Sequence, residues 1–134
     1  MKHRIYPTAV LAALFILSQF AAAQAPAQPS PKMRAANELY SQKKYAESAA
    51  AFADLVKEEP NNGRAWYFLG MSYHSQAKYE PAIAAFEKNL SIAQNPFAMY
   101  NIACGHARLK QTDKASEWVE KAMKAAPGVL GNME

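Results

Sequence analysis

The 134-residue sequence contains a single cysteine, Cys104, so no disulfide can form within the chain. Glycine is also scarce, with five residues, whereas alanine is abundant. Alanine loses no side-chain entropy in a helix and glycine loses much backbone entropy, so this balance favours helices. No segment alternates apolar and polar residues for long enough to predict a strand. We therefore expect one helical domain that is held together by its apolar core.

The charge of the chain gives little support for nucleic-acid binding. The formal net charge is +4, and two of the cations, Lys2 and Arg4, lie in an N-terminal segment that we expect to be removed. Without that segment the net charge is about +2. Nucleic-acid binding surfaces need clustered lysine and arginine. Nucleic acid is therefore not an expected partner.

The N-terminal segment has the pattern of a secretory signal peptide. A basic start, MKHR, precedes a 13-residue apolar run over residues 8–20, and small residues follow at Ala21 and Ala23. The run is shorter than the roughly 20 residues that a membrane-spanning helix needs. We predict a signal peptide over residues 1–23, export to the periplasm of a Gram-negative cell, and no stable membrane insertion after cleavage. An uncleaved membrane anchor is the alternative.

The rest of the chain is predicted to be helical. Residues 24–31 hold three prolines, which predict an extended linker. Apolar residues at helical spacing then predict six helices in three hairpins. The hairpins are separated by breaks at Pro60 with NNG (61–63) and at QNP (94–96). The predicted domain covers residues 32–128, with units over about 32–60, 63–96 and 97–127 and a tail over 129–134.

The hairpins repeat at a nearly constant step. A shift of 34 residues places Tyr79, Phe86 and Leu90 on Tyr45, Phe52 and Val56. The second helix of the third unit fits a shift of 33 instead, which suggests a turn one residue shorter at KQTDK. The shift of 34 gives the first helix of that unit these equivalences: Tyr100 for Trp66, Ala103 for Leu69, Cys104 for Gly70 and Ala107 for Tyr73.

The middle unit resembles the tetratricopeptide repeat. It reads W-x₂-L-G-x₂-Y over residues 66–73 and A-x₃-F over residues 82–86. The resemblance implies an all-α fold in which three helix-turn-helix hairpins stack as a short right-handed α-solenoid. Small residues such as Gly70 would let two helices approach closely. The aromatic residues Trp66, Tyr73 and Phe86 would fill the spaces between helices as part of the core.

No group of residues predicts catalysis, a cofactor or a metal site. His74 and His106 are 32 residues apart, with no acidic residue at ligand spacing, and a metal site usually needs three or four ligands. Cys104 and His106 are two residues apart on a predicted helix, so they point in different directions. We expect Cys104 to be a buried structural residue and the protein to be non-enzymatic.

The resemblance also implies that the first helices line a concave groove that binds a protein or peptide segment. Tyrosine and arginine are frequent in binding hot spots, and methionine adapts its shape readily. Carried over to this sequence, the groove would contain Met33, Asn37, Tyr40, Arg64, Tyr67, Met71, His74, Asn101, Gly105 and Arg108.

The last predicted helix offers a second binding surface. Trp118 and Met123 lie on its broad apolar stripe, and the residues that follow are too few for a further helix. We expect Trp118 to be partly bare unless Val129 and Leu130 cover it. An uncovered apolar end is typical of self-association or docking. The alternative function is therefore a structural subunit that forms a homo-oligomer or joins a larger complex through this end.

Overall fold

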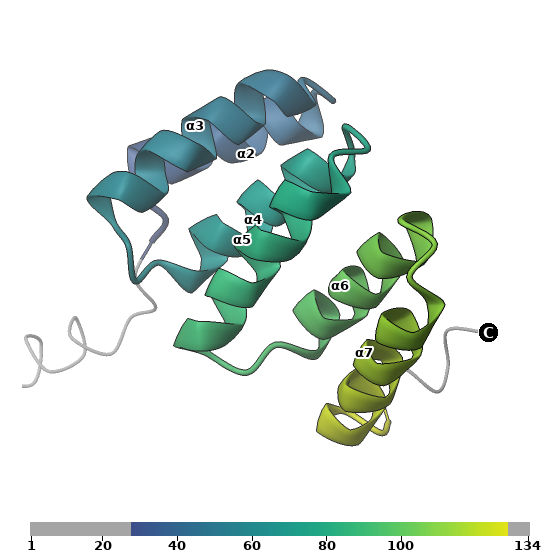
Figure 1. Cartoon of the computed structure of the whole chain (residues 1–134). Coiled ribbons are helices and arrows are strands. Elements are labelled where there is room, and N and C mark those ends of the chain that lie inside the picture. The colour runs from purple at the N-terminus through teal and green to yellow at the C-terminus, as the bar shows by residue number, and fades with distance from the viewer. Residues whose placement is uncertain (1–27, 129–134) are drawn as a thin grey trace, which may run out of the picture.

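The computed structural model describes residues 28–128, which form six α-helices and no β-strand. The all-α fold in three hairpins that the sequence predicts is confirmed (Figure 1). The predicted signal peptide, most of the predicted linker and the predicted tail lie outside the described residues. The helices are α2 (Pro31–Ser41), α3 (Tyr45–Glu58), α4 (Gly63–His74), α5 (Tyr79–Ile92), α6 (Pro96–Arg108) and α7 (Thr112–Ala125).

The first helix of each hairpin begins at a polar cap. The side chains of Ser30, Asn62 and Asn95 each accept a hydrogen bond from a backbone N–H of the first turn. Pro31 and Pro96 then occupy the first helical position, where the missing N–H has no intrahelical partner to lose. Pro31 and Pro96 therefore mark helix starts.

The turn inside each hairpin contains a residue in the left-handed backbone conformation. These residues are Lys43, Ala77 and Lys110, with φ of 60°, 57° and 60°. None is a glycine, although glycine adopts this conformation at the lowest cost. The recurrence of the same backbone conformation shows that the three hairpins turn in the same way.

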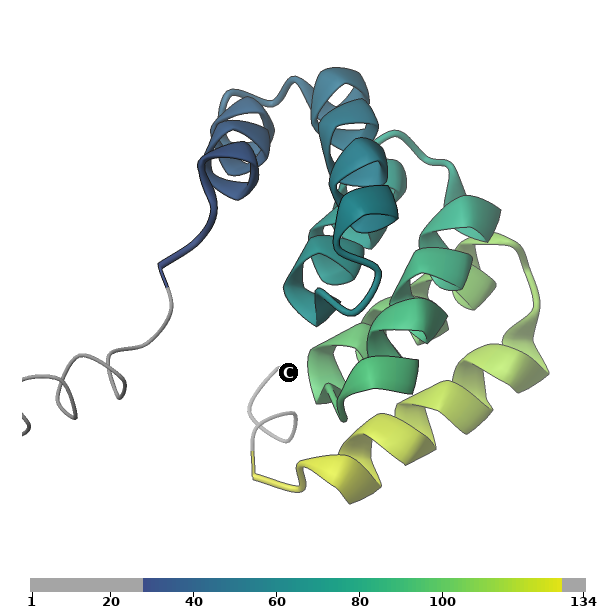
Figure 2. The same cartoon turned by 90° about the vertical axis from the view of Figure 1, so that its left-hand side faces the viewer.

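The hairpins stack in chain order as a short α-solenoid (Figures 1 and 2). Each helix packs on the next helix along the chain, and α2 also touches α4. Two clusters of buried apolar side chains run through the stack. One cluster is centred on Phe52, Leu55 and Leu69, and the other on Ile83, Phe86 and Ile102.

Gly70 and Phe86 are in close contact inside the middle hairpin. The ring of Phe86 is fully buried, and a Cβ atom placed on Gly70 would lie only 2.6 Å from its Cε1 atom. Trp66 and Tyr73 are half-buried against the first cluster, and the Trp66 Nε1–H donates to the Pro60 carbonyl at 2.8 Å. The aromatic residues of the predicted motif therefore belong to the core, as the resemblance implied.

The third unit is displaced by one residue from its predicted alignment. The helix caps Asn62 and Asn95 are 33 residues apart, as are the left-handed turn residues Ala77 and Lys110. The step of 33 therefore holds for both helices of this unit, and the prediction of 34 for the first of them is wrong. The shorter connection lies before α6, where residues 93–95 replace the four residues 59–62 that precede α4.

The burial pattern supports the corrected step. At a shift of 33, buried positions of α4 fall on buried positions of α6, with Ala65 on Ala98 and Leu69 on Ile102. Ala103, not Cys104, occupies the position of Gly70. Cys104 is only half-buried, so its prediction as the small buried residue of the motif is wrong. No helix among residues 28–128 is long and apolar enough to cross a membrane.

Candidate functional site

The first helices α2, α4 and α6 are joined by side chains that reach from one helix to the next. We call this surface the first-helix wall. The Tyr40 ring lies edge-on to the Phe68 ring at 6.1 Å between centroids, which connects α2 to α4. The Asn101 side-chain amide donates to the Tyr67 hydroxyl at 3.3 Å, and this contact connects α4 to α6. The same amide lies 3.5 Å from the Met71 sulfur.

Most residues predicted to line the groove are at least partly accessible on this wall. Arg64 and Arg108 are exposed. The remaining members are half-buried, namely Asn37, Tyr40, Tyr67, Met71, His74 and Asn101. The wall therefore combines aromatic rings, amides, a thioether and two cations.

Met33 and Gly105 do not belong to the accessible wall. The Met33 side chain is 2% exposed and packs in the first core cluster. The first unit has Lys32 where the middle unit has Trp66, and the flexible Met33 side chain helps to fill this part of the core. Gly105 is buried against Ile83, with 2.9 Å between a Cβ placed on it and Ile83 Cγ1. Both groove predictions are therefore wrong.

Phe68 is a wall residue that the sequence analysis did not include. Its ring stacks on Phe52 at 5.7 Å and lies 5.8 Å from the guanidinium carbon of Arg64. Asn101 occupies the equivalent position of α6 at the corrected step of 33. Phe68 and Asn101 occupy the same repeat position, and each faces the preceding first helix. A repeat step of 33 in the sequence alignment would therefore have identified Phe68 as a wall residue.

The hydroxyl of Tyr67 is held in place at the junction of α4 and α6. Its partial burial raises the pKa of Tyr67, and the hydrogen bond from Asn101 acts in the opposite direction. The Tyr67 ring also packs against Phe86 at 5.7 Å between centroids. The wall is therefore anchored directly on the hydrophobic core, and its central side chain is neutral at pH 7.

His74 lies near the end of α4 in a partly buried position. Its Nε2 atom is buried and has no hydrogen-bond partner among the described residues. Its ring lies edge-on to Tyr79 at 5.4 Å between centroids. Burial lowers the pKa of His74, and the positive charge of Arg108 lowers it further. The imidazole is therefore expected to be neutral at pH 7.

This lowered pKa predicts a loss of stability in weak acid. The folded state binds a proton at His74 less readily than the unfolded chain does. Above about pH 6.5 His74 therefore does not lower the free energy of unfolding, and below that pH this free energy decreases until the pKa of the folded state is reached. We expect His74→Gln to remove most of the decrease in unfolding free energy between about pH 7 and pH 5. Urea unfolding across this range measures it.

Arg108→Gln is the matched control, because it removes the neighbouring charge and leaves the ring buried. It should reduce the pH dependence without abolishing it, since burial is the larger cause of the shift. Parallel loss of stability in the wild-type protein and in His74→Gln would contradict the assignment.

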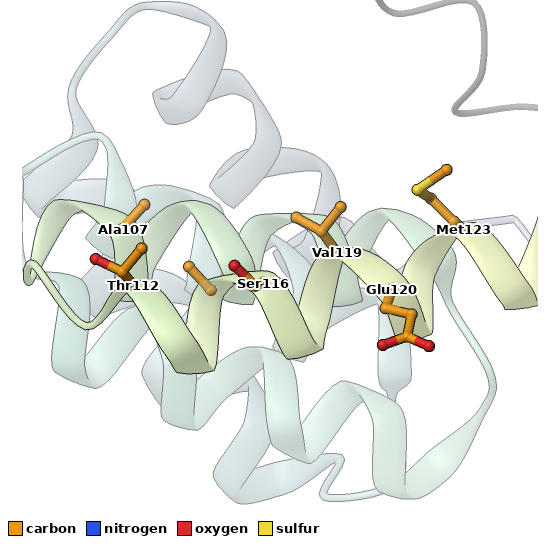
Figure 3. Close-up of a pocket in the computed structure, with 7 residues that line it drawn as sticks. Ala107, Thr112, Ser116, Val119, Glu120 and Met123 are labelled. Carbon is orange, nitrogen blue, oxygen red and sulfur yellow. The ribbon is translucent and has the colours of Figure 1, made fainter.

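A second accessible apolar site lies on the last hairpin, in a groove between α6 and α7. Val119 is 39% exposed and Met123 is 53% exposed. They project from the same side of α7 (Figure 3). Together with Ala107, Ala115 and Ser116 they line a groove of about 410 Å³. Val119 stands at the position of the buried Phe86, and it is accessible because no described helix follows α7.

Trp118 does not face this groove. It is half-buried against the second core cluster, and the Lys121 ammonium lies 4.3 Å from its ring centroid. Trp118 is partly exposed, as expected, but it lies outside the groove, whereas Met123 lines it; the docking role of both residues stays a prediction. At the step of 33, Trp118 corresponds to the buried Ala85, which explains its inward direction.

The remaining reactive side chains are not gathered at one place. His106 Nδ1 lies 2.7 Å from the Gln111 side-chain oxygen, at the turn between α6 and α7. Cys104 lies beside Tyr100 and raises the pKa of its hydroxyl. Among residues 28–128, no three His, Cys, Asp or Glu side chains are placed to hold a metal ion.

Comparison with solved structures finds the same architecture elsewhere. A chain of the CopN-Scc3 complex aligns with a TM-score of 0.69 and 24% sequence identity. The alignment covers 71% of this chain and 56% of that chain, so this chain spans little more than half of that protein. At this identity the similarity concerns the fold. No curated protein matches the sequence at a significant level.

The repeat itself is matched by family models. One model of the tetratricopeptide repeat family matches residues 33–98, and a second matches residues 98–128. Together they cover all six helices apart from the first two residues of α2. The matched length, the repeated hairpins and the Gly70–Phe86 contact all indicate stacked helix-turn-helix repeats. The chain belongs to the tetratricopeptide repeat family.

Proposed function

We propose that this chain is a non-catalytic interaction module that binds a segment of another protein on the first-helix wall. The observation that supports this most directly is the connected row of partly exposed side chains across α2, α4 and α6. Tyrosine and arginine contribute strongly to binding when they can be desolvated by a partner. The wall offers Tyr40, Tyr67, Arg64 and Arg108 for this role.

The wall is also organised in advance of binding. Tyr67 is held by Asn101 and by the Phe86 ring, and Phe68 is held by Phe52. Side chains that are already fixed lose less conformational entropy when a partner binds. A partner segment would therefore meet a surface that does not need to rearrange.

A second candidate function is supported by the exposed groove of α6 and α7. Val119 and Met123 are apolar and exposed on α7. In the middle hairpin the residue equivalent to Val119, Phe86, is buried. In this alternative the chain is a structural subunit that self-associates or joins a larger complex through α7. The first-helix wall would then have no binding role.

Photo-crosslinking separates the two functions. In the full chain, a photo-reactive amino acid replaces either Tyr67 or Met123, and the crosslinked products are identified. Our proposal predicts a partner crosslink at Tyr67 that Met71→Lys suppresses about tenfold and Met123→Lys leaves unchanged. A crosslink formed only from position 123, and lost when Val119→Lys is introduced beside it, would overturn the proposal and support the alternative.

We also propose that the protein acts in the cell envelope after export. The basic start, the apolar run and the small residues at Ala21 and Ala23 support this location. Expression in a Gram-negative host should give a periplasmic protein that begins at Gln24. Intact-mass measurement on the fractionated protein tests this, and a full-length product retained in the cytoplasm would overturn it.

A further inference from the structure

Neither cation of the first-helix wall forms an ion pair within residues 28–128, although Glu59 lines the same surface hollow as Arg64. Arg64 is the second residue of α4 and Arg108 is the last residue of α6, and neither helix contains an aspartate or a glutamate. Among residues 28–128, the ion pairs join Lys32 to Glu58 and lysines to acids within α3 and α7. None of these ion pairs involves Arg64 or Arg108, so both guanidinium groups remain available to a ligand.

The second helices have the opposite charge. Together α3, α5 and α7 carry eight acidic residues and five lysines, which gives these helices a net charge of −3. The first helices carry four cations and one acid, a net charge of +3. A negatively charged ligand is therefore attracted to the first-helix wall and repelled from the second helices.

The surface between the two arginines is apolar and aromatic. Tyr67, Phe68 and Met71 lie on α4 between the two ends of the wall, and Arg64 already leans over the Phe68 ring at 5.8 Å. Such a surface suits an apolar side chain, because burying it removes apolar area from water on both partners. The wall therefore presents a cation, an apolar patch and a second cation in series.

The helical geometry sets the separation of the two cations. Arg108 is level with Ser75 at the repeat step of 33, eleven residues along α4 from Arg64, or about 16 Å at 1.5 Å per residue. Side chains of α4 and α6 meet at Asn101 and Tyr67. With the two axes about 10 Å apart, at the upper end for packed helices, the diagonal between the arginines is about 19 Å. A segment in the polyproline II conformation, with three residues per turn and about 3.1 Å per residue, covers this distance in about six residues. The side chain midway then faces the same way as the two at the ends.

We propose that the first-helix wall binds an extended acidic segment of a partner protein, in which two carboxylates about six residues apart flank an apolar side chain. This inference rests on the proposed function, because it specifies the chemistry of the segment that binds there. One carboxylate pairs with Arg64 and the other with Arg108, while the apolar side chain between them packs on Phe68 and Tyr67.

Blocked synthetic peptides test the charge spacing. The first probe has two glutamates six positions apart, with phenylalanine midway, on a glycine-serine background. The second has the same composition with the two glutamates adjacent, and the third has lysines in place of the glutamates. Fluorescence anisotropy with the full chain at low salt should rank the spaced peptide first, roughly threefold to tenfold above the adjacent one, with the lysine peptide weakest.

Matched charge reversals test the site. Arg64→Glu combined with Arg108→Glu should weaken the spaced peptide by about tenfold or more. Lys88→Glu combined with Lys114→Glu on α5 and α7 changes the net charge by the same amount and should weaken it less than about twofold. Circular dichroism and thermal unfolding confirm that both variants fold, which is expected because all four side chains are exposed.

Three outcomes would overturn the inference. Equal weakening by the two double variants would show attraction to net charge alone, and equal affinity for the two glutamate peptides would remove the spacing. Binding to phosphatidylglycerol vesicles that depends on Arg64 and Arg108, with no peptide binding, would assign the cations to a membrane. If the crosslink from position 67 still forms in the Arg64→Glu, Arg108→Glu variant in any of these cases, the proposed function stands without the acidic segment. If no crosslink forms from position 67 even without these reversals, the proposed function and the acidic-segment inference both fail.

Discussion

Phe86→Ala should lower the free energy of unfolding by about 3–5 kcal/mol, the range for removing a fully buried aromatic ring from a packed core. The Phe86 ring is 0% exposed and packs in the second cluster with Ile83 and Ile102. It also meets Gly70 within its own hairpin and Tyr67 on the first-helix wall. The cavity would therefore open where two hairpins and the wall meet.

Urea unfolding followed by circular dichroism measures this loss. Phe97→Ala is the matched control, because it makes the same chemical change at a side chain that is 49% exposed, and it should cost less than about 1 kcal/mol. Since domains of this size are stable by only about 5–15 kcal/mol, Phe86→Ala should leave a detectable unfolded population. Equal effects of the two substitutions would contradict the placement of Phe86 in the core.

Gly70→Leu should destabilise the protein by about 3 kcal/mol, at the upper end of the range for overpacking. A Cβ atom on this residue would lie 2.6, 2.7 and 2.9 Å from three carbons of the Phe86 ring. The ring cannot retreat, because it is enclosed by the second cluster. Leucine is a much better helix former than glycine, so a loss of stability here cannot come from helix propensity.

A comparison of two glycines tests the steric explanation. Gly70→Ala should be destabilising despite the gain in helix propensity, whereas Gly63→Ala should be neutral or stabilising, because its new Cβ would lie 3.4 Å from the nearest atom. Thermal unfolding of both variants gives the sign of each effect. Gly70→Ala combined with Phe86→Leu should recover part of the loss if the ring is the obstacle. A stabilised Gly70→Ala protein would contradict the close approach of α4 and α5.

The middle hairpin could be predicted in detail because its residue types are distinctive. A tryptophan, a leucine-glycine pair and a phenylalanine at fixed spacing allow one alignment. That alignment identified Gly70 as a point of close helix approach and Phe86 as a core residue, and both are confirmed. The third unit has alanine and cysteine in sequence at residues 103 and 104, and both are small enough for the position of Gly70. Side-chain size therefore could not distinguish a step of 33 from a step of 34.

The error in step had consequences for the predicted wall. It placed Gly105 on the surface, whereas the corrected step puts Cys104 at the position of Met71 and buries Gly105 against Ile83. The helix caps Asn62 and Asn95 carried the missing information, since asparagine is a favoured helix cap and the two residues are 33 positions apart. The burial of Met33 depended on how its flexible side chain fills the space between neighbouring helices, which the pattern of residue types does not specify.

The end-to-end order of the hairpins affects how the protein opens. Within residues 28–128 the α4–α5 hairpin has a neighbour on each side, whereas the α2–α3 and α6–α7 hairpins each have only one. In a chain of nearest-neighbour contacts, fraying starts at the termini, so amide hydrogens of the outer hairpins exchange sooner than those at the centre. A segment bound across all three first helices would link the outer hairpins to the central one. It would therefore slow amide exchange most in the α2–α3 and α6–α7 hairpins.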